Sequence, residues 1–196
     1  MDRGDFLFPS RIPTGERGER IIKRLTEIPY DRGAAVRYAH TWAYCRNPRY
    51  FNYDGIGGDC TNFASQCLYA GTGVMNFTPI YGWYYLDPND KAPAWTGVPY
   101  FRNFLVRTEP SPGPFAREVS LEEVEPGDFI QLRFDKERFT HTPIVVEVGS
   151  PAAPDNILVA AHSDDTDFCP LNRYDCRALR CLHILGAWKW EENEEK

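Results

Sequence analysis

Residues 57–71 read GGDCTNFASQCLYAG and carry the strongest structural signal of the chain. Asp59 is a preferred N-cap residue, and apolar side chains then recur at 60, 63, 64, 67 and 68, which is the spacing of one helix face. Cys60 falls in the first turn, where unpaired N–H groups and the helix dipole favour a thiolate and lower the pKa of a thiol. The sequence therefore predicts a buried helix that ends near Gly71, with a nucleophilic Cys60 at its start and Cys67 in the core.

The segment GDCTNFASQ at 58–66 resembles the signature of a bacterial putative amidase domain family. That family is itself similar to the NlpC-type and CHAP-type papain-like cysteine hydrolases. The resemblance covers roughly residues 30–185 and implies an α+β, papain-like or NlpC-like fold, in which the nucleophile helix packs on an antiparallel sheet of four or more strands. The other matching segments, in the same order, are Tyr30-Asp31-Arg32, Ala34-Ala35-Val36, Asn47-Pro48 with Tyr50, Pro126-Gly127-Asp128 and His141.

Length and charge limit the possible classes of function. A chain of 196 residues is long enough for one well-buried domain, predicted over 26–190. The net charge of -6 argues against a nucleic-acid partner, because binding to phosphate backbones needs clustered lysine and arginine. No run of about 18 apolar residues is present, so no membrane-spanning helix is predicted.

The N-terminal part contains arginine, proline and glycine among alternating charges, which predicts an arm over residues 1–25. Whether it is a flexible arm, a pro-segment or a docking strand stays open. It lacks the apolar stretch of a secretory signal. This favours the cytoplasm for the chain as written, although similar domains are often exported or associated with the cell wall.

Turn signals and periodicity divide the rest of the chain into a helical first half and a strand-rich second half. A short helix is expected over 19–27, and a longer one follows the N-cap residue Asp31. Residues 72–117 are irregular and rich in proline and aromatic residues, with one helix at 98–106. They are expected to form a wall of the substrate cleft or, equally, to pack on the core. Strands are expected over 129–134, 142–148, 157–163 and 179–185.

A thiolate that attacks an amide needs an imidazole to protonate the leaving amine, and a group that orients this imidazole. His141 begins an expected strand, and the resemblance implies that the base stands there. His162 on the neighbouring strand is the expected orienting residue. Asp164 is the alternative, since strict alternation puts it on the same face as His162. The backbone N–H of Cys60 is expected to donate to the oxyanion.

Aromatic residues are candidates for contacts with the oxyanion and the substrate. Related hydrolases use a tyrosine upstream of their cysteine, so the resemblance points to Tyr50 or Tyr53 without deciding between them. Trp83 and Trp95 belong to the aromatic-rich segment 72–117 and are expected to line the cleft. The alternative for all four side chains is packing in the core.

The cysteines near the C-terminus could hold a metal ion or form a disulfide. No C-x-x-C pair brings two ligands together, so the sequence predicts no metal site and no cofactor. A disulfide between Cys169 and Cys176 is the alternative in an oxidising compartment, and reduced thiols are expected otherwise. The residues weighed as zinc ligands are Cys169, Cys176, Cys181 and His183.

These residues together predict a cysteine amidase or peptidase that works through a thioester acyl-enzyme. The predicted partner is a peptide or amide substrate, and the resemblance makes a peptidoglycan-derived cell-wall peptide one candidate. Residue chemistry alone indicates acyl transfer, so an acyltransferase with the same Cys-His pair stays open. The rival from another class is an inactive module that binds through the aromatic cleft. The sequence does not indicate an oligomeric state.

Overall fold

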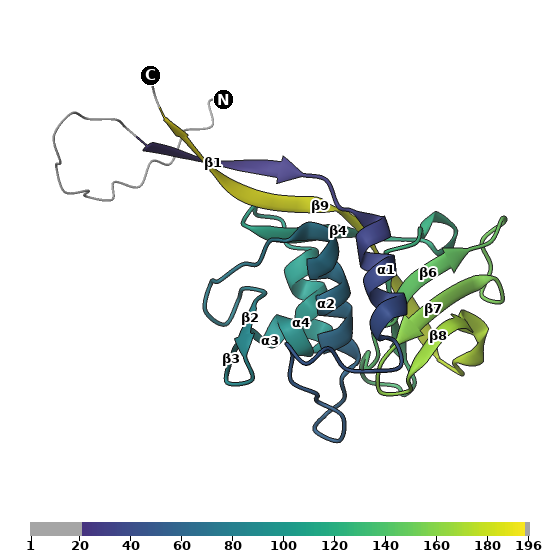
Figure 1. Cartoon of the computed structure of the whole chain (residues 1–196). Helices are drawn as coiled ribbons and strands as arrows, with labels where there is room; N and C mark the ends of the chain where they lie inside the picture. The colour runs from purple at the N-terminus through teal and green to yellow at the C-terminus, as the bar shows by residue number, and fades with distance from the viewer. Residues whose placement is uncertain (1–20, 195–196) are drawn as a thin grey trace, which may run out of the picture.

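An antiparallel sheet of seven strands forms the framework of residues 21–194, the part of the chain that the computed structural model describes (Figure 1). The strand order is β1-β9-β5-β6-β7-β8, and β4 pairs with β9. β2 and β3 form a separate hairpin. The strands are β1 (Ile21–Ile28), β2 (Tyr85–Asp87), β3 (Asp90–Lys91), β4 (Gly113–Val119), β5 (Phe129–Arg133), β6 (Ile144–Val148), β7 (Ile157–Ala161), β8 (Thr166–Pro170) and β9 (Ala178–Glu194).

Helices α1 and α2 pack against each other, and both contact the sheet at β7. Almost all of α2 is buried, so this helix forms the centre of the domain. Within the described residues, every helix is too short or too polar to span a bilayer. The helices are α1 (Arg32–Trp42), α2 (Cys60–Thr72), α3 (Pro93–Thr96) and α4 (Val98–Leu105), with short 3-10 turns at η1 (Leu121–Glu123) and η2 (Leu171–Arg173).

Side chains of the sheet alternate between two hydrophobic clusters. Phe129 and Ile144 pack with the aromatic core around α2, whereas their neighbours Ile130 and Val145 belong to a second cluster with Leu171. Alternation of this kind is expected for strands that are covered on both faces. Both faces of the sheet are therefore covered by hydrophobic packing.

Tyr30 and Gly71 hold α2 close to the turn before β5. A Cβ at position 71 would collide with the Tyr30 ring, whose hydroxyl donates to the carbonyl of Gly127 at 2.8 Å. Gly71 is therefore a point of close approach and not the helix end. The helix continues to Thr72, and Gly73 in the left-handed conformation forms its C-cap.

The predicted α+β class with an antiparallel sheet is confirmed, as are the start of α2 and the Asp31 cap of α1, which accepts from Ala34 N at 2.8 Å. The helix expected over 19–27 is wrong, because residues 21–28 form β1 and pair with β9. The last residues of the predicted arm 1–25 thus belong to the sheet. Residues 1–20 lie outside the described part. β1, β2, β3, β4 and β8 were not predicted, and β9 is longer than expected.

Candidate active site

A turn of two glycines delivers the chain to Cys60, the first residue of α2. Gly57 and Gly58 have φ angles of 91° and 98°, a region that side chains rarely adopt. A Cβ at Gly58 would lie 3.2 Å from the hydroxyl of Ser163, and this hydroxyl accepts from the backbone N–H of Asp59 at 2.8 Å. The turn therefore holds the start of α2 against the segment that follows β7.

The sulfur of Cys60 lies against the segment that carries His141. Sγ is 3.9 Å from the carbonyl oxygen of Thr140 and 3.8 Å from the hydroxyl of Thr61. The hydroxyls of Thr61 and Thr142 are 3.3 Å apart, and the backbone of Thr142 acts to lower the pKa of the Cys60 thiol. Thr140 and Thr142, the sequence neighbours of His141, thus both contact the first turn of α2, which contains Cys60. The fold brings the two predicted reacting residues into one neighbourhood.

His141 lines a pocket of about 490 Å³ that also contains the alternative candidate Asp164. The ring of Tyr174 stands beside His141, with centroids 5.4 Å apart. Acidic, basic and aromatic side chains share this pocket, which suits a polar ligand. Its lining residues are Phe134, Thr140, His141, Ser163, Asp164, Arg173, Tyr174 and Asp175.

Two polar atoms of this pocket, Nε2 of His141 and the hydroxyl of Tyr174, are buried and have no hydrogen-bond partner among the described residues. Buried polar groups in native proteins are nearly always paired, so such atoms indicate a place where a ligand's polar groups can bind. Sequence reasoning missed Tyr174. It lies between η2 and β9, far from the motif around Cys60, and no local pattern distinguishes it.

Burial controls the charge of both reacting groups. It raises the pKa of the Cys60 thiol, which outweighs the lowering effect of the N–H groups of Thr142 and Thr61; the carboxylate of Asp59 raises it further. The lowered thiol pKa expected at the helix start is therefore wrong. Burial also lowers the pKa of His141 to about 4, with Asp164 acting in the opposite direction. At neutral pH the site holds a neutral thiol and a neutral imidazole.

His162 bonds to the start of α2 and to the end of α1. Its Nδ1 lies 2.6 Å from Oδ2 of Asp59 and its Nε2 lies 2.8 Å from the carbonyl oxygen of Trp42. The ring also stacks on Phe63 with centroids 3.9 Å apart. Both ring nitrogens of His162 already have partners. The prediction that His162 bonds to His141 and orients it is therefore wrong. Asp59 stands at the N-cap position, but its side chain makes no capping bond.

Trp83 and Trp95 do not line a cleft, since both side chains are fully buried. Their indole N–H groups donate to Oγ of Ser65 at 3.0 Å and to Oδ1 of Asn62 at 2.9 Å, and their rings lie 4.8 Å apart. The expectation of substrate contacts is therefore wrong for these two residues. Trp83 and Trp95 instead pack on α2, which was the alternative, whereas Phe77, Tyr81 and Tyr100 of the same segment are exposed.

The two upstream tyrosines differ in their surroundings. Tyr50 is buried in the core, where its ring stacks on Trp95 with centroids 5.9 Å apart. The expectation that it contacts the substrate is therefore wrong, and it is a packing residue. The hydroxyl of Tyr53 is buried without a partner among the described residues, and burial raises its pKa to about 12. Its role as an oxyanion donor stays a prediction.

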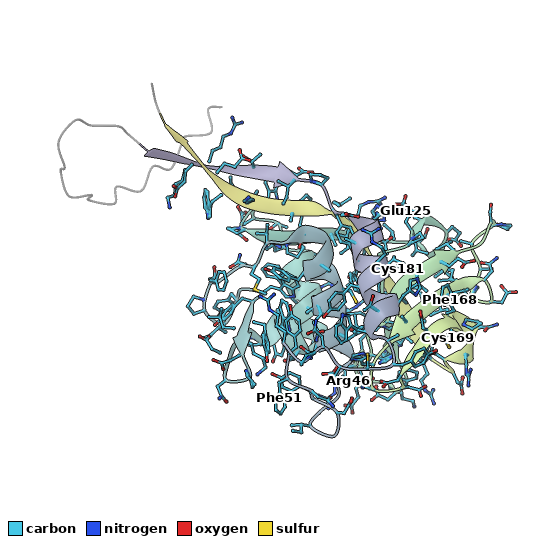
Figure 2. All side chains as sticks on the ribbon, viewed as in Figure 1. Arg46, Phe51, Glu125, Phe168, Cys169 and Cys181 are labelled. Carbon is cyan, nitrogen blue, oxygen red and sulfur yellow. The ribbon has the colours of Figure 1, made fainter. Side chains whose placement is uncertain are left out.

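The residues weighed as zinc ligands have other surroundings. His183 bonds through Nδ1 to Oδ2 of Asp128 at 2.8 Å, and Cys169 and Cys176 are both free thiols. Figure 2 labels Cys169 and Cys181, both of which are buried. Within residues 21–194, no three His, Cys, Asp or Glu side chains are grouped so as to hold a metal ion.

Comparisons with known proteins give a family and one relative. The family described as "Putative amidase domain" matches residues 29–185. The uncharacterized protein YhbB of Bacillus subtilis (strain 168) is 32% identical over 155 residues, which are 74% of this chain and 49% of that protein. The chain thus spans about half the length of this relative. No solved structure matches the chain, so the papain-like or NlpC-like architecture stays a prediction.

Proposed function

The chain belongs to the putative amidase domain family, and from this premise we propose that it hydrolyses an amide bond with Cys60 as nucleophile and His141 as base. One observation carries the proposal: the residues on both sides of His141 contact the first turn of α2. Thr140 does so through its carbonyl oxygen at Sγ of Cys60, and Thr142 through its hydroxyl at that of Thr61. Amide hydrolysis by a cysteine nucleophile needs the thiol and the imidazole within reach of each other. The contact between the hydroxyls of Thr61 and Thr142 joins residues 81 positions apart in the sequence.

Two neutral reacting groups imply that the thiol is activated when the substrate binds. His141 takes the proton from Sγ of Cys60 as the sulfur attacks the carbonyl carbon, and the resulting imidazolium protonates the leaving amine. The C–N bond breaks and a thioester remains on the sulfur. His141, now neutral, removes a proton from water as the water oxygen attacks the thioester. The acid product leaves and the sulfur regains its proton.

Asp164 is the carboxylate that we assign to the imidazolium of His141. It lines the same pocket and raises the pKa of His141, which is the effect of a negative charge that favours the protonated ring. The hydrogen bonds of His162 support this choice, because both of its ring nitrogens already have partners. Asp164 thereby replaces His162 as the third member of the proposed site.

The oxyanion of the tetrahedral intermediate needs preorganised donors. The backbone N–H of Cys60 is one, since the first residue of a helix has no intrahelical acceptor for it. The hydroxyl of Tyr174 is a second candidate beside Tyr53. Burial, with Cys169 and Asp164 among the groups acting on it, raises the pKa of Tyr174 and keeps this hydroxyl protonated.

The substrate that we propose is a peptide amide, with peptidoglycan-derived peptides as the first to be tried. The test is covalent capture of Cys60 by a peptidyl chloromethyl ketone in a Cys45→Ser background, which removes the exposed thiol of Cys45. We expect stoichiometric labelling at Cys60 by mass spectrometry and a rate at least about 100-fold lower in His141→Gln. Hydrolysis of short peptides is then measured by release of amine.

The same experiment addresses the rival function. An inactive binding module has no reason to activate one sulfur above another. In the protein with its natural Cys45, labelling of Cys60 that is slower than labelling of Cys45, and that is unchanged by His141→Gln, would contradict the hydrolase and favour the binding module. Loss of labelling in His141→Gln with product appearing only in the presence of an added amine would favour acyl transfer.

The low pKa of His141 predicts how activity depends on pH. His141 acts as a base only when neutral, so kcat/KM should stay high on acidification until about pH 4, where the ring gains its proton. Asp164→Asn removes the carboxylate that raises this pKa, and the acid limb should therefore move to lower pH. Profiles of kcat/KM for both proteins, over a range in which circular dichroism shows them folded, check this expectation.

Asp175→Asn is the matched control for Asp164→Asn, because Asp175 lines the same pocket but is not among the groups that act on the pKa of His141. Its acid limb should coincide with that of the natural protein. An acid limb near pH 6.5, the ordinary value for histidine, would contradict the buried neutral base. An upward movement in Asp164→Asn would contradict the role of Asp164.

A further inference from the structure

The hydrogen bonds of His162 determine its charge. The side chain is 1% exposed, and each ring nitrogen faces an oxygen atom: Nδ1 faces Oδ2 of Asp59 at 2.6 Å, and Nε2 faces the carbonyl oxygen of Trp42 at 2.8 Å. A backbone carbonyl can only accept a hydrogen bond. Nε2 of His162 therefore carries a hydrogen.

The carboxyl group of Asp59 is surrounded by donors and is itself an acceptor. Its Oδ1 accepts from the backbone N–H of Tyr53 at 3.0 Å and from the side-chain amide of Asn62 at 2.8 Å. Its Oδ2 lies 3.5 Å from Nε of Arg46. Donors on both oxygens stabilise the ionised carboxylate. Nδ1 of His162 must then donate as well, and a ring with hydrogens on both nitrogens is an imidazolium.

The charges around this pair support the extra proton. Arg46, labelled in Figure 2, also forms ion pairs with Asp54 and Asp165. Its Nη2 lies no more than 2.7 Å from a carboxylate oxygen of each. One guanidinium among three carboxylates leaves an excess of negative charge. A proton on His162 reduces this excess at Asp59, the most deeply buried of the three acids.

We propose that His162 is a positioning residue of the site: a buried imidazolium that joins the carboxylate of Asp59 to the carbonyl of Trp42 and offsets the negative charge next to Cys60. This role in catalysis rests on the proposed amidase function, whereas the charge of His162 does not. The carboxylate of Asp59 raises the pKa of the Cys60 thiol. A cation bonded to that carboxylate weakens this effect and eases proton transfer from the sulfur to His141.

The first experiment reads the charge directly by NMR of the ring nitrogens of the full chain at neutral pH. The chain has four histidines, so signals can be assigned with His40→Gln, His141→Gln and His183→Gln even if a variant at 162 does not fold. We expect both nitrogens of His162 to carry hydrogen, and His141 to be neutral. A neutral tautomer of His162 would overturn the proposal.

The second experiment measures the pH at which iodoacetamide alkylates Cys60 at half its maximal rate, in the Cys45→Ser background. His162→Gln keeps a donor but removes the charge, and we expect this midpoint to rise by about one pH unit. Adding Asp59→Asn should reverse the shift, because the charge that His162 offsets is then gone. A midpoint that His162→Gln leaves unchanged, or that the double variant leaves raised, would overturn the proposal.

His40 offers a matched control, since it also bonds to a carboxylate, that of Asp167 at 2.9 Å, but connects α1 with β8 instead of reaching the start of α2. His40→Gln should not move the midpoint of Cys60. An equal shift in this control would overturn the assignment to His162. Neither measurement requires the protein to turn over a substrate. If His162 is an imidazolium but the protein hydrolyses no amide, only the proposed function is wrong. If the protein is an active hydrolase but His162 is neutral, only this inference is wrong.

Discussion

Cys60→Ala should abolish amide hydrolysis, and His141→Gln should lower kcat/KM by at least about 1,000-fold. The sulfur forms the bond to the substrate, so no other group replaces it. Without His141 the thiol loses its proton acceptor, and the leaving amine loses its donor. Because burial raises the pKa of Cys60, little thiolate exists at neutral pH to react without a base. Steady-state rates at pH 7 with a peptide substrate measure both effects.

Cys67→Ala is the control that separates chemistry from packing. Cys67 is also a buried sulfur of α2, but it lies in the hydrophobic core and far from the helix start. This variant should lose some stability through its cavity and keep most of its activity. Activity of Cys60→Ala above about one per cent, or equal losses in Cys60→Ala and Cys67→Ala, would contradict the nucleophile.

The parts of the fold that sequence reasoning predicted are those with strong local signals. α2 has a helical apolar face preceded by two glycines, and α1 has an N-cap residue in Asp31 that makes its bond. β1 gave no strand signal, because its apolar residues at 21, 22, 25 and 28 do not alternate with polar ones, and its partner β9 lies far along the chain. Tertiary pairing decides such strands, and a local pattern does not encode it.

The candidate site shows the same division. Cys60 and His141 could be proposed from a motif and from chain order, and their roles stay predictions; the fold does bring their sequence neighbours into contact. The partner of His162 could not, since it depends on which carboxylate the fold puts within reach of each nitrogen. The burial of Trp95 could not be predicted from the sequence either. Aromatic residues in a proline-rich segment are typical both of a cleft wall and of a core.

The motif Pro126-Gly127-Asp128 contributes a carboxylate with four hydrogen-bond partners just before β5. Asp128 is fully buried, and its Oδ1 accepts from Nη1 of Arg32 at 2.7 Å and from the backbone N–H of Ile184 at 3.0 Å. Its Oδ2 bonds with Nδ1 of His183 at 2.8 Å and accepts from the backbone N–H of Glu125 at 2.8 Å. This side chain therefore ties the start of α1 to β9 and to the turn before β5.

Asp128→Ala should lower the free energy of unfolding by about 3–5 kcal/mol, because it leaves Arg32 and a buried backbone N–H without their acceptor. Asp128→Asn keeps an acceptor oxygen and should cost less. Glu118→Gln is the control: it breaks the ion pair with Arg102, which is partly exposed, and should cost no more than about 1 kcal/mol. Urea unfolding of the full chain measures all three. Equal costs for Asp128→Ala and Glu118→Gln would show that α1 is held in place by packing alone.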